Sequence, residues 1–289
     1  MIKKMYLAVL AFSTLAMSCS SDDDSSVPTN ADLTLNLSGL EALGNDYIYE
    51  GWIIVNGAPV STGTFSSVTF PQTFSVNAAQ LNSATAFVLS IEPAIDPDPA
   101  PADTKLLRGD FSGNQAALNT ELIGNFNSAS GQFFLRTPTD EMGMNNMNDE
   151  NGVWFGTPGM PPTPNFVLPS LPEGWTYEGW VVGDTGPLTT GTFSAFDSAD
   201  NAAPFSGTAQ SGPPVPGEDF FMNAPAGETF PLDIRGRMVV ISVEPVPDNS
   251  PAPFAIKPLV GIAGDETAPA THNFGQNLSS LPTGMVTRN

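Results

Sequence analysis

A segment that is typical of a β-strand and its return strand occurs twice in this chain, and this repeat constrains the fold more than any other feature. Tyr49-Glu50-Gly51-Trp52 recurs as Tyr177-Glu178-Gly179-Trp180, and ten of the 18 positions from 49 to 66 are identical in the second copy. Further along, Ile91-Glu92-Pro93 matches Val243-Glu244-Pro245. A repeat of this length predicts two modules of the same fold.

The distance between the matched segments is 24 residues longer in the second copy, which indicates an insertion. We expect a long loop within 197–228, because this stretch is rich in Gly, Pro and Ala.

Composition and local pattern favour an all-β fold. The chain has 27 Gly and 28 Pro, which interrupt helices and bound short strands. Leu alternates with polar residues over 33–37, and Asn56-Gly57 is a strong signal for a two-residue hairpin. A Trp in a central strand of each copy then predicts two tandem immunoglobulin-like β-sandwich domains.

Short apolar runs between turn residues locate the expected strands. In the first module they cover 33–37, 52–55, 60–65, 73–76, 86–91 and 105–111. In the second module they cover 180–182, 188–193, 220–223, 238–243 and 256–261. A hairpin with a long tip is expected from 132–136 and 153–155, in the second domain or at the junction.

The repeated aromatic residues are expected to fill the cores, because aromatic side chains bury large areas in such sandwiches. An aromatic platform for a carbohydrate is the alternative. Glu92 and Glu244, each followed by a Pro (Pro93 and Pro245), recur at strand ends. We expect these carboxylates to accept hydrogen bonds from a neighbouring loop, with a ligand contact as the alternative.

Cys19 is the only cysteine, and it directly follows a short apolar run that begins after Lys3 and Lys4. Residues 1–18 therefore have the pattern of a signal peptide. About 13 apolar residues are too few to span a membrane, which takes about 20. Residues 15–19 resemble a bacterial lipobox, which implies cleavage before Cys19 and a lipid anchor that includes a fatty acid such as palmitate. A plain secretory signal is the alternative.

The residues that follow Cys19 are mostly Ser and Asp. A solvated tether explains them. They also resemble the segment after the lipid-bearing cysteine in lipoproteins of Bacteroidota-type bacteria. That resemblance implies a place in the cell envelope at the outer membrane, either on its periplasmic face or at the cell surface.

The formal net charge is -21. Such a surface repels phosphate backbones and disfavours nucleic acids as partners. With Cys19 acylated, neither a disulfide nor a cysteine-zinc site can form.

The sequence offers little chemistry, and we expect no enzyme activity, cofactor or metal. The single histidine, His272, lies in a loop-like stretch without a nucleophile motif. Two patterns leave metal binding open. Met142, Met144 and Met147 are spaced thioethers that could hold Cu(I). Acidic loops that could hold Ca²⁺ contain Asp96, Asp98, Asp103, Asp140, Glu141, Asp149 and Glu150.

The domain division follows from the repeat. A signal peptide is expected at 1–18 and an acidic tether at 19–30. The first sandwich is expected at 31–128, the hairpin or junction at 129–164, and the second sandwich at 165–289.

The Tyr-Glu-Gly-Trp strand, the Thr-Gly-x-Phe return and the later Glu-Pro element resemble the extracytoplasmic domain of RskA-type anti-sigma-K factors. Both copies carry the pattern. Asp96-Pro97-Asp98 and Asp248-Asn249-Ser250 stand where the family tends to have Gly-Gly. Factors of this kind hold the sigma factor with a cytoplasmic segment, so the expected export of this chain argues against direct contact with a cytoplasmic sigma factor.

These observations predict a non-enzymatic, lipid-anchored envelope protein that works by binding or as a structural element, with an envelope protein or a glycan as its partner. One alternative is a detached sensor module that acts with an envelope anti-sigma protein. Another is an envelope hydrolase with an unrecognised site.

Overall fold

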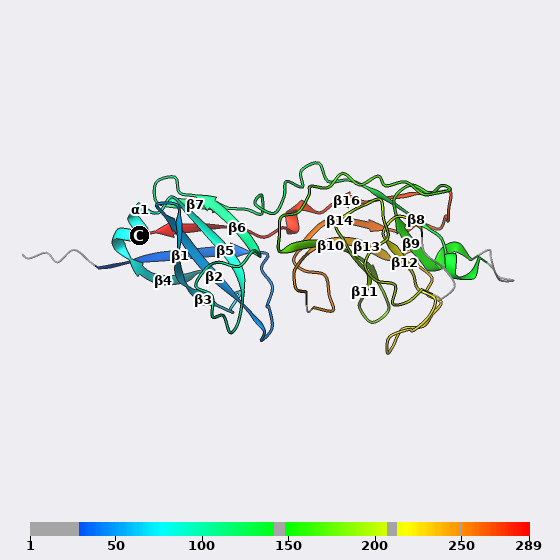
Figure 1. Cartoon of the computed structure of the whole chain (residues 1–289), viewed down its shortest axis with the longest axis horizontal. Helices are drawn as coiled ribbons and strands as arrows, with labels where there is room; N and C mark the ends of the chain where they lie inside the picture. The colour runs from blue at the N-terminus through cyan, green and yellow to red at the C-terminus, as the bar shows by residue number, and fades with distance from the viewer. Residues whose placement is uncertain (1–28, 142–147, 207–212, 249) are drawn as a thin grey trace, which may run out of the picture.

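The computed structural model describes residues 29–141, 148–206, 213–248 and 250–289. It confirms the all-β fold: four antiparallel sheets form two sandwiches that lie end to end along the long axis (Figure 1). In the described part of the chain, no helix has the length and hydropathy needed to cross a membrane.

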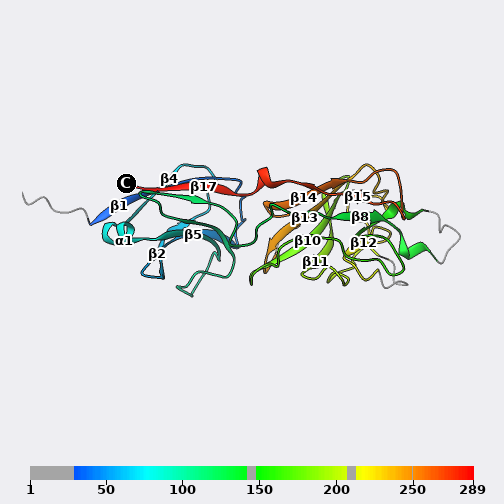
Figure 2. The ribbon, with the colours of Figure 1, turned by 90° about the horizontal axis from the view of Figure 1, so that it is seen from above.

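The first sandwich packs two four-stranded sheets face to face (Figure 2). One sheet has the strand order β4 (Gln72–Asn77), β1 (Asn30–Ser38), β17 (Thr283–Arg288) and β7 (Gln115–Leu118). The other has the order β3 (Ala58–Phe65), β2 (Tyr47–Val55), β5 (Ala86–Pro93) and β6 (Lys105–Asp110). A short helix, α1 (Ala78–Ser83), follows β4 and begins where the side chain of Asn77 accepts a hydrogen bond from the Gln80 amide.

The second sandwich has a five-stranded and a four-stranded sheet. The larger sheet has the order β11 (Pro187–Phe193), β10 (Trp175–Val182), β13 (Met238–Pro245), β14 (Ile256–Ile262) and β16 (Gly275–Gln276). The smaller has the order β12 (Gly217–Asp219), β9 (Gly152–Phe155), β8 (Gln132–Leu135) and β15 (His272–Asn273). The expected hairpin is therefore β8 and β9, at the centre of the smaller sheet. Single 3-10 turns cover Pro138–Asp140, Asp149–Asn151 and Leu278–Ser280.

The two sandwiches are nested rather than tandem. β17 returns to the first sandwich, where it pairs with β1 and β7, so the second sandwich is inserted between β7 and β17 (Figure 1). This corrects the division that placed all of 165–289 in the second domain. β17 covers a backbone edge of β1 that would otherwise be unpaired, and Val286 becomes fully buried.

Most expected strands are present, and the hairpin at Asn56-Gly57 is confirmed, since these residues have φ angles of 52° and 81°. The strand expected over 220–223 is wrong, because β12 ends at Asp219 and the main chain then bonds to Asn151 and Phe205. The strands β7, β15, β16 and β17 were not predicted. They have two to six residues and few apolar side chains, so their pairing depends on distant partners.

The repeated segments have the same pairing in both sandwiches. β2 lies between β3 and β5, and β10 lies between β11 and β13, with a register shift after the motif glycine in each. The glycine leaves room for a phenylalanine ring, which comes from β9 of the opposite sheet in the second sandwich and from the adjacent strand β5 in the first. A Cβ atom on Gly179 would lie 2.3 Å from the Phe155 ring, and one on Gly51 would lie 2.9 Å from the Phe87 ring. The motif is therefore a core element of each sandwich.

Candidate functional site

The repeated aromatic residues are all buried, but only the Tyr and Phe residues belong to the core between the sheets. The two Trp residues, which were expected to fill that core, are not part of it. Trp52 and Trp180 are 3% and 2% exposed, and each donates its indole N–H to a serine hydroxyl at 2.8 Å, Ser90 in one copy and Ser242 in the other. The hydroxyl of each motif tyrosine donates to a main-chain carbonyl eight residues earlier. Buried side chains with satisfied polar atoms cannot present a flat platform to a carbohydrate.

The two repeated glutamates hold equivalent loops. The Ala102 amide donates to both carboxylate oxygens of Glu92, at 3.0 and 3.1 Å. The Phe254 amide donates in the same way to Glu244, at 2.9 and 3.1 Å. In each copy the serine that accepts from the Trp also donates to the glutamate. Burial raises the pKa of both carboxyls, and that of Glu244 reaches about 8. These contacts fix the loops that follow β5 and β13.

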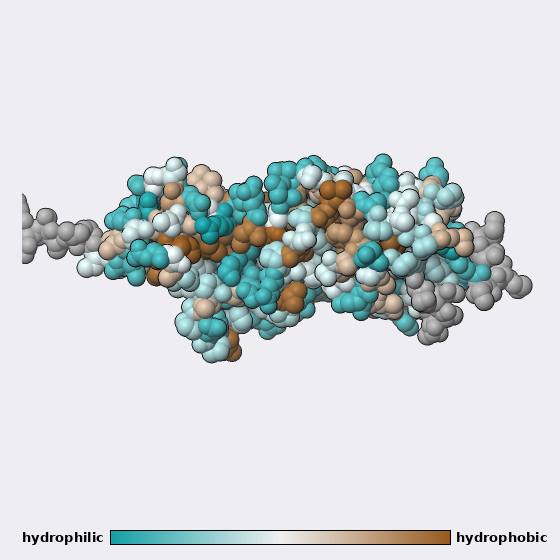
Figure 3. Space-filling view, turned by 45° about the horizontal axis from the view of Figure 1, so that its top comes forward, coloured by the Kyte–Doolittle hydropathy of each residue, from teal (hydrophilic) through white to brown (hydrophobic). Residues whose placement is uncertain are grey.

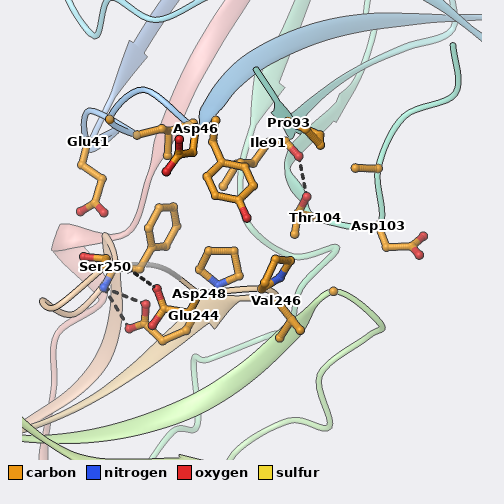
Figure 4. A pocket seen from close by; sticks show the side chains of 18 of the residues that line it. Glu41, Asp46, Ile91, Pro93, Asp103, Thr104, Glu244, Val246, Asp248 and Ser250 are labelled. Carbon is orange, nitrogen blue, oxygen red and sulfur yellow. Dashed lines mark hydrogen bonds between the residues drawn. The ribbon is translucent and has the colours of Figure 1, made fainter. Parts of the chain in front are cut away.

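Those loops face each other where the sandwiches meet, and together with residues 41–47 and 173–174 they line a cleft of about 560 Å³. The first sandwich contributes residues 41–47 and 102–104, with Ile91 and Pro93. The second contributes residues 173–174 and 244–248, with Ser250 and Phe254 (Figure 4). A cleft of this size between domains is typical of a small-ligand site.

The cleft combines apolar walls with acidic side chains. Figure 3 shows hydrophobic side chains between hydrophilic ones where the two sandwiches meet. The apolar lining comprises Ala42, Leu43, Tyr47, Ile91, Pro93, Ala102, Pro245, Val246, Pro247 and Phe254. The acidic lining comprises Glu41, Asp46, Asp103, Glu173, Glu244 and Asp248. The described residues that line the cleft include no Lys, Arg or His.

Glu41 and Asp248 bring two carboxylates from different sandwiches near each other. Burial raises the pKa of the Glu41 carboxyl, Lys257 lowers it, and Asp248 raises it again. The Lys257 ammonium itself donates to the Phe254 carbonyl at 2.6 Å. Sequence reasoning did not nominate Glu41, Tyr47 or Phe254, because they lie in or beside irregular loops where no local pattern marks them.

The other predicted sites have structural contacts. Asp96 and Asp98 accept hydrogen bonds from the amides two residues further on, at 2.8 and 3.0 Å. Asp103 lies 3.7 Å from the Lys105 ammonium. Within the described residues, no three His, Cys, Asp or Glu side chains are placed to hold a metal ion. Cys19 with the signal peptide, and the Met142, Met144 and Met147 group, lie outside the described residues.

Three of the four predicted acidic residues at 140–150 also have partners, while one oxygen of Asp140 is buried without a hydrogen bond among the described residues. Glu141 pairs with Arg136, and Glu150 lies 3.9 Å from Arg235. The carboxylate of Asp149 accepts a hydrogen bond from the Thr137 amide at 3.3 Å.

His272 is 9% exposed and both ring nitrogens contact the main chain. Nδ1 accepts from the Gly264 amide at 3.1 Å, and Nε2 lies 2.9 Å from the Glu266 carbonyl. The ring packs on Phe133, with 5.2 Å between centroids. These contacts give His272 a structural role in holding β15 against β8.

A group of buried carboxyls in the second sandwich was not predicted. Burial raises the pKa of Glu178 and Asp200 to about 7, and that of Glu218 to about 8. Asp200 and Glu218 belong to the insertion, and the charge of Glu178 in the repeated motif also raises the pKa of Asp200. The length of the insertion was visible in the sequence, but the surface that it covers was not.

Comparison with known proteins identifies one relationship. Residues 15–104, about a third of the chain, match the family model described as anti-sigma-K factor rskA, C-terminal. The first sandwich is similar to that domain. The match includes β1 to β5 and ends at Thr104, so it contains every cleft residue of the first sandwich. No curated protein and no solved structure matched this chain.

Proposed function

We propose that this chain is a lipid-anchored, non-enzymatic protein of the cell envelope that binds a partner in the cleft between two anti-sigma-K-factor-like sandwiches. The observation that carries the proposal is the composition of the cleft. Equivalent loops of the two repeats, held by Glu92 and Glu244, form both of its walls.

The topology supports display from an anchored N-terminus. β1 begins at Asn30, and the main chain of Asn289 bonds to Asp32, so the strand nearest the tether is paired along its length. Figure 1 shows that β1 starts at the end of the first sandwich that is farthest from the second sandwich. A lipid on Cys19 would therefore hold this end at a membrane and leave the cleft accessible from the periplasm or the cell surface.

The carboxyls of the cleft suit binding better than acid-base catalysis. Glu244 has a pKa raised to about 8 by burial. Its two oxygens are occupied by the Phe254 amide, and Ser242 also donates to it. A general acid must reach the substrate, whereas this carboxyl is committed to its own loop.

The similarity to an anti-sigma-K domain bears on the class of partner. We propose that the partner is another envelope protein rather than a cytoplasmic sigma factor, because export would separate the chain from the cytoplasm. The detached sensor module is the form of this proposal in which that envelope protein is itself an anti-sigma or sensor protein.

The anchor is tested by mass spectrometry of the N-terminus after expression in a bacterium with a lipoprotein pathway. We expect cleavage before Cys19 and a diacylglycerol on its sulfur, and partition into the detergent phase. A Cys19→Ala variant should remain uncleaved. An uncleaved, unmodified wild-type N-terminus would overturn the anchoring.

Binding is tested by crosslinking in intact envelopes. Ala42→Trp fills the cleft, while Ala58→Trp places the same side chain on the exposed start of β3. We expect the crosslinked product of the wild type to be lost in Ala42→Trp and kept in Ala58→Trp. Equal crosslinking in the two variants would place the partner elsewhere and refute the cleft as the binding site.

A further inference from the structure

The cleft is more acidic than the rest of an already acidic protein. Six of its 21 lining residues are Asp or Glu, against 30 of 289 in the whole chain. This is about three times the average density. The described lining has no basic side chain, although the ammonium groups of Lys105 and Lys257 donate to the carbonyls of Ala102 and Phe254. The six carboxyls outnumber these two lysines, so the cleft favours a cation over phosphates and carboxylates.

Not all six carboxylates are available to a ligand. Glu244 is bound by its own loop, and Asp103 lies beside Lys105 and points away from the cleft in Figure 4. One oxygen of Asp248 accepts from the Ser250 amide at 2.8 Å, which leaves the other.

Glu41 is the carboxylate best placed to receive a ligand. In Figure 4 it extends from the loop of the first sandwich toward the segment that carries Ser250. Within the described residues, no hydrogen bond to its carboxylate is found. Lys257 offsets only part of the cost of burying Glu41, since the pKa of this carboxyl is still raised, and the Lys257 ammonium donates to the Phe254 carbonyl. A positive group between Glu41 and Asp248 would relieve the remaining desolvation and the repulsion.

The walls of the cleft suit a ligand whose charged group is attached to an apolar body. Tyr47 and Phe254 line the cleft from opposite sandwiches, and Phe254 is held in place against Trp175, with 6.0 Å between the ring centroids. Pro93 and Val246 add aliphatic surface. Aromatic faces attract cations, and apolar walls favour methylene groups, so both parts of a basic organic group are accommodated.

Building on the proposed function, we infer that the cleft binds an organic cation, a primary ammonium or guanidinium group on an apolar body, between Glu41 and Asp248. The group comes either from a free amine or from a Lys or Arg side chain of the partner. Both sources present the same kind of charged group to the cleft, and two sets of probes distinguish them.

Calorimetric titration of the lipidated full chain in a neutral detergent tests the charge requirement. Benzamidine is compared with benzamide, which has almost the same shape and no charge. We expect benzamidine to bind at one site and benzamide to bind about tenfold more weakly, as for the loss of a charge-assisted hydrogen bond. Equal affinity, or no binding of benzamidine, overturns the inference.

Variants of the two carboxylates test whether the cation binds between them. Glu41→Gln and Asp248→Asn should each weaken benzamidine about fivefold or more. Asp110→Asn, at the far end of β6 from the cleft, removes one exposed carboxylate and should leave the affinity unchanged. An equal loss in all three variants would mean that only the net charge of the protein matters, and would overturn the site.

The source of the cation is read from two peptides, N-acetyl-Gly-Arg-Gly-amide and the same peptide with citrulline in place of Arg. Tighter binding of the Arg peptide than of benzamidine indicates a basic segment of a protein, while the reverse order indicates a free amine. If no cation binds but Ala42→Trp still abolishes crosslinking, the proposed function stands and this inference falls. If cations bind but Ala42→Trp leaves the crosslink intact, the inference stands and the partner site is elsewhere.

Discussion

The two sandwiches contain the same strand motif, but the glutamate of the motif is more deeply buried in the second than in the first. In both copies the glutamate accepts a hydroxyl hydrogen bond from the return strand, from Ser61 in the first sandwich and from Thr189 in the second. Glu50 is half-buried, whereas Glu178 is 6% exposed and its second oxygen has no hydrogen-bond partner among the described residues. Burial raises the pKa of Glu178 to about 7.

The insertion also makes the surroundings of the motif differ between the copies, because it carries Asp200, whose pKa is raised by burial and further by the charge of Glu178. A Cβ atom on Gly63 would lie 3.4 Å from the Phe74 ring, while one on the equivalent Gly191 would lie 2.9 Å from the Asp200 carboxyl carbon. The loop between β11 and β12 therefore approaches β11 at the position where β4 approaches β3. The same strand sequence therefore holds its glutamate half-buried in one sandwich and buried with a raised pKa in the other, because burial disfavours the charged form.

Removal of residues 283–289 should have the largest effect, and it tests the nested arrangement. β17 is an inner strand of its sheet, and the Arg288 guanidinium donates to the carbonyls of Leu81, Ala84 and Gly113. We expect thermal unfolding to show loss of the first sandwich with the second retained. The free energy lost with two strand ladders exceeds the whole free energy of unfolding of a typical domain. Met285→Ala, which changes a side chain that is 36% exposed, should leave both transitions in place. If the truncated chain keeps both transitions, the nesting is wrong.

The second-largest expected effect is a difference between the two sandwiches in how their stability depends on pH. In the second, burial raises the pKa of Glu178 to about 7 and that of Glu218 and Glu244 to about 8. Each folded carboxyl keeps a proton that the unfolded chain releases above about pH 4.5. Its stabilising contribution is thus complete below that pH and is lost as the pH rises toward 8. Each such proton changes the unfolding constant about tenfold per pH unit between the two pKa values.

Urea denaturation at pH 5 and pH 8 measures this effect. The second sandwich should lose more stability than the first, in which Glu41 and Glu92 also have a raised pKa. Glu218→Gln should reduce the slope for the second sandwich, while Glu121→Gln, an exposed change in the first, should not alter it. Parallel pH profiles for the two sandwiches would contradict the comparison.

The smallest expected effect comes from a matched pair of threonines. Thr62 donates its hydroxyl to the Gly51 carbonyl at 2.9 Å. The equivalent Thr190 is fully buried, and its hydroxyl has no partner among the described residues. Thr62→Val should cost about 1 kcal/mol, whereas Thr190→Val should be neutral or stabilising, since it removes an unsatisfied polar atom. Chemical denaturation of both variants decides the matter, and an equal cost at the two positions would refute it.

The features that were predictable depend on neighbours in the sequence. Leu33, Leu35 and Leu37 alternate with polar residues, so they identify β1 and its buried face. Asn56-Gly57 is a turn wherever it occurs between two strands, because both positions accept a positive φ. The repeated Tyr and Phe residues were correctly predicted to fill the cores, whereas Trp52 and Trp180 are buried outside them.

The cleft was not predictable, because residues 41–47 and 245–254 have no periodicity, and each loop by itself shows nothing of the other. The sequence by itself determined the repeated strands, their tight turn and the carboxylates at their ends, since short-range sterics and side-chain alternation act within a few residues. Only the tertiary structure decided that β17 crosses to the first sandwich, that Glu178 is buried while Glu50 is not, and that Glu41 and Asp248 line the same cleft. Those pairings join segments far apart in the chain, and their free energy comes from surfaces that exist only after both have folded.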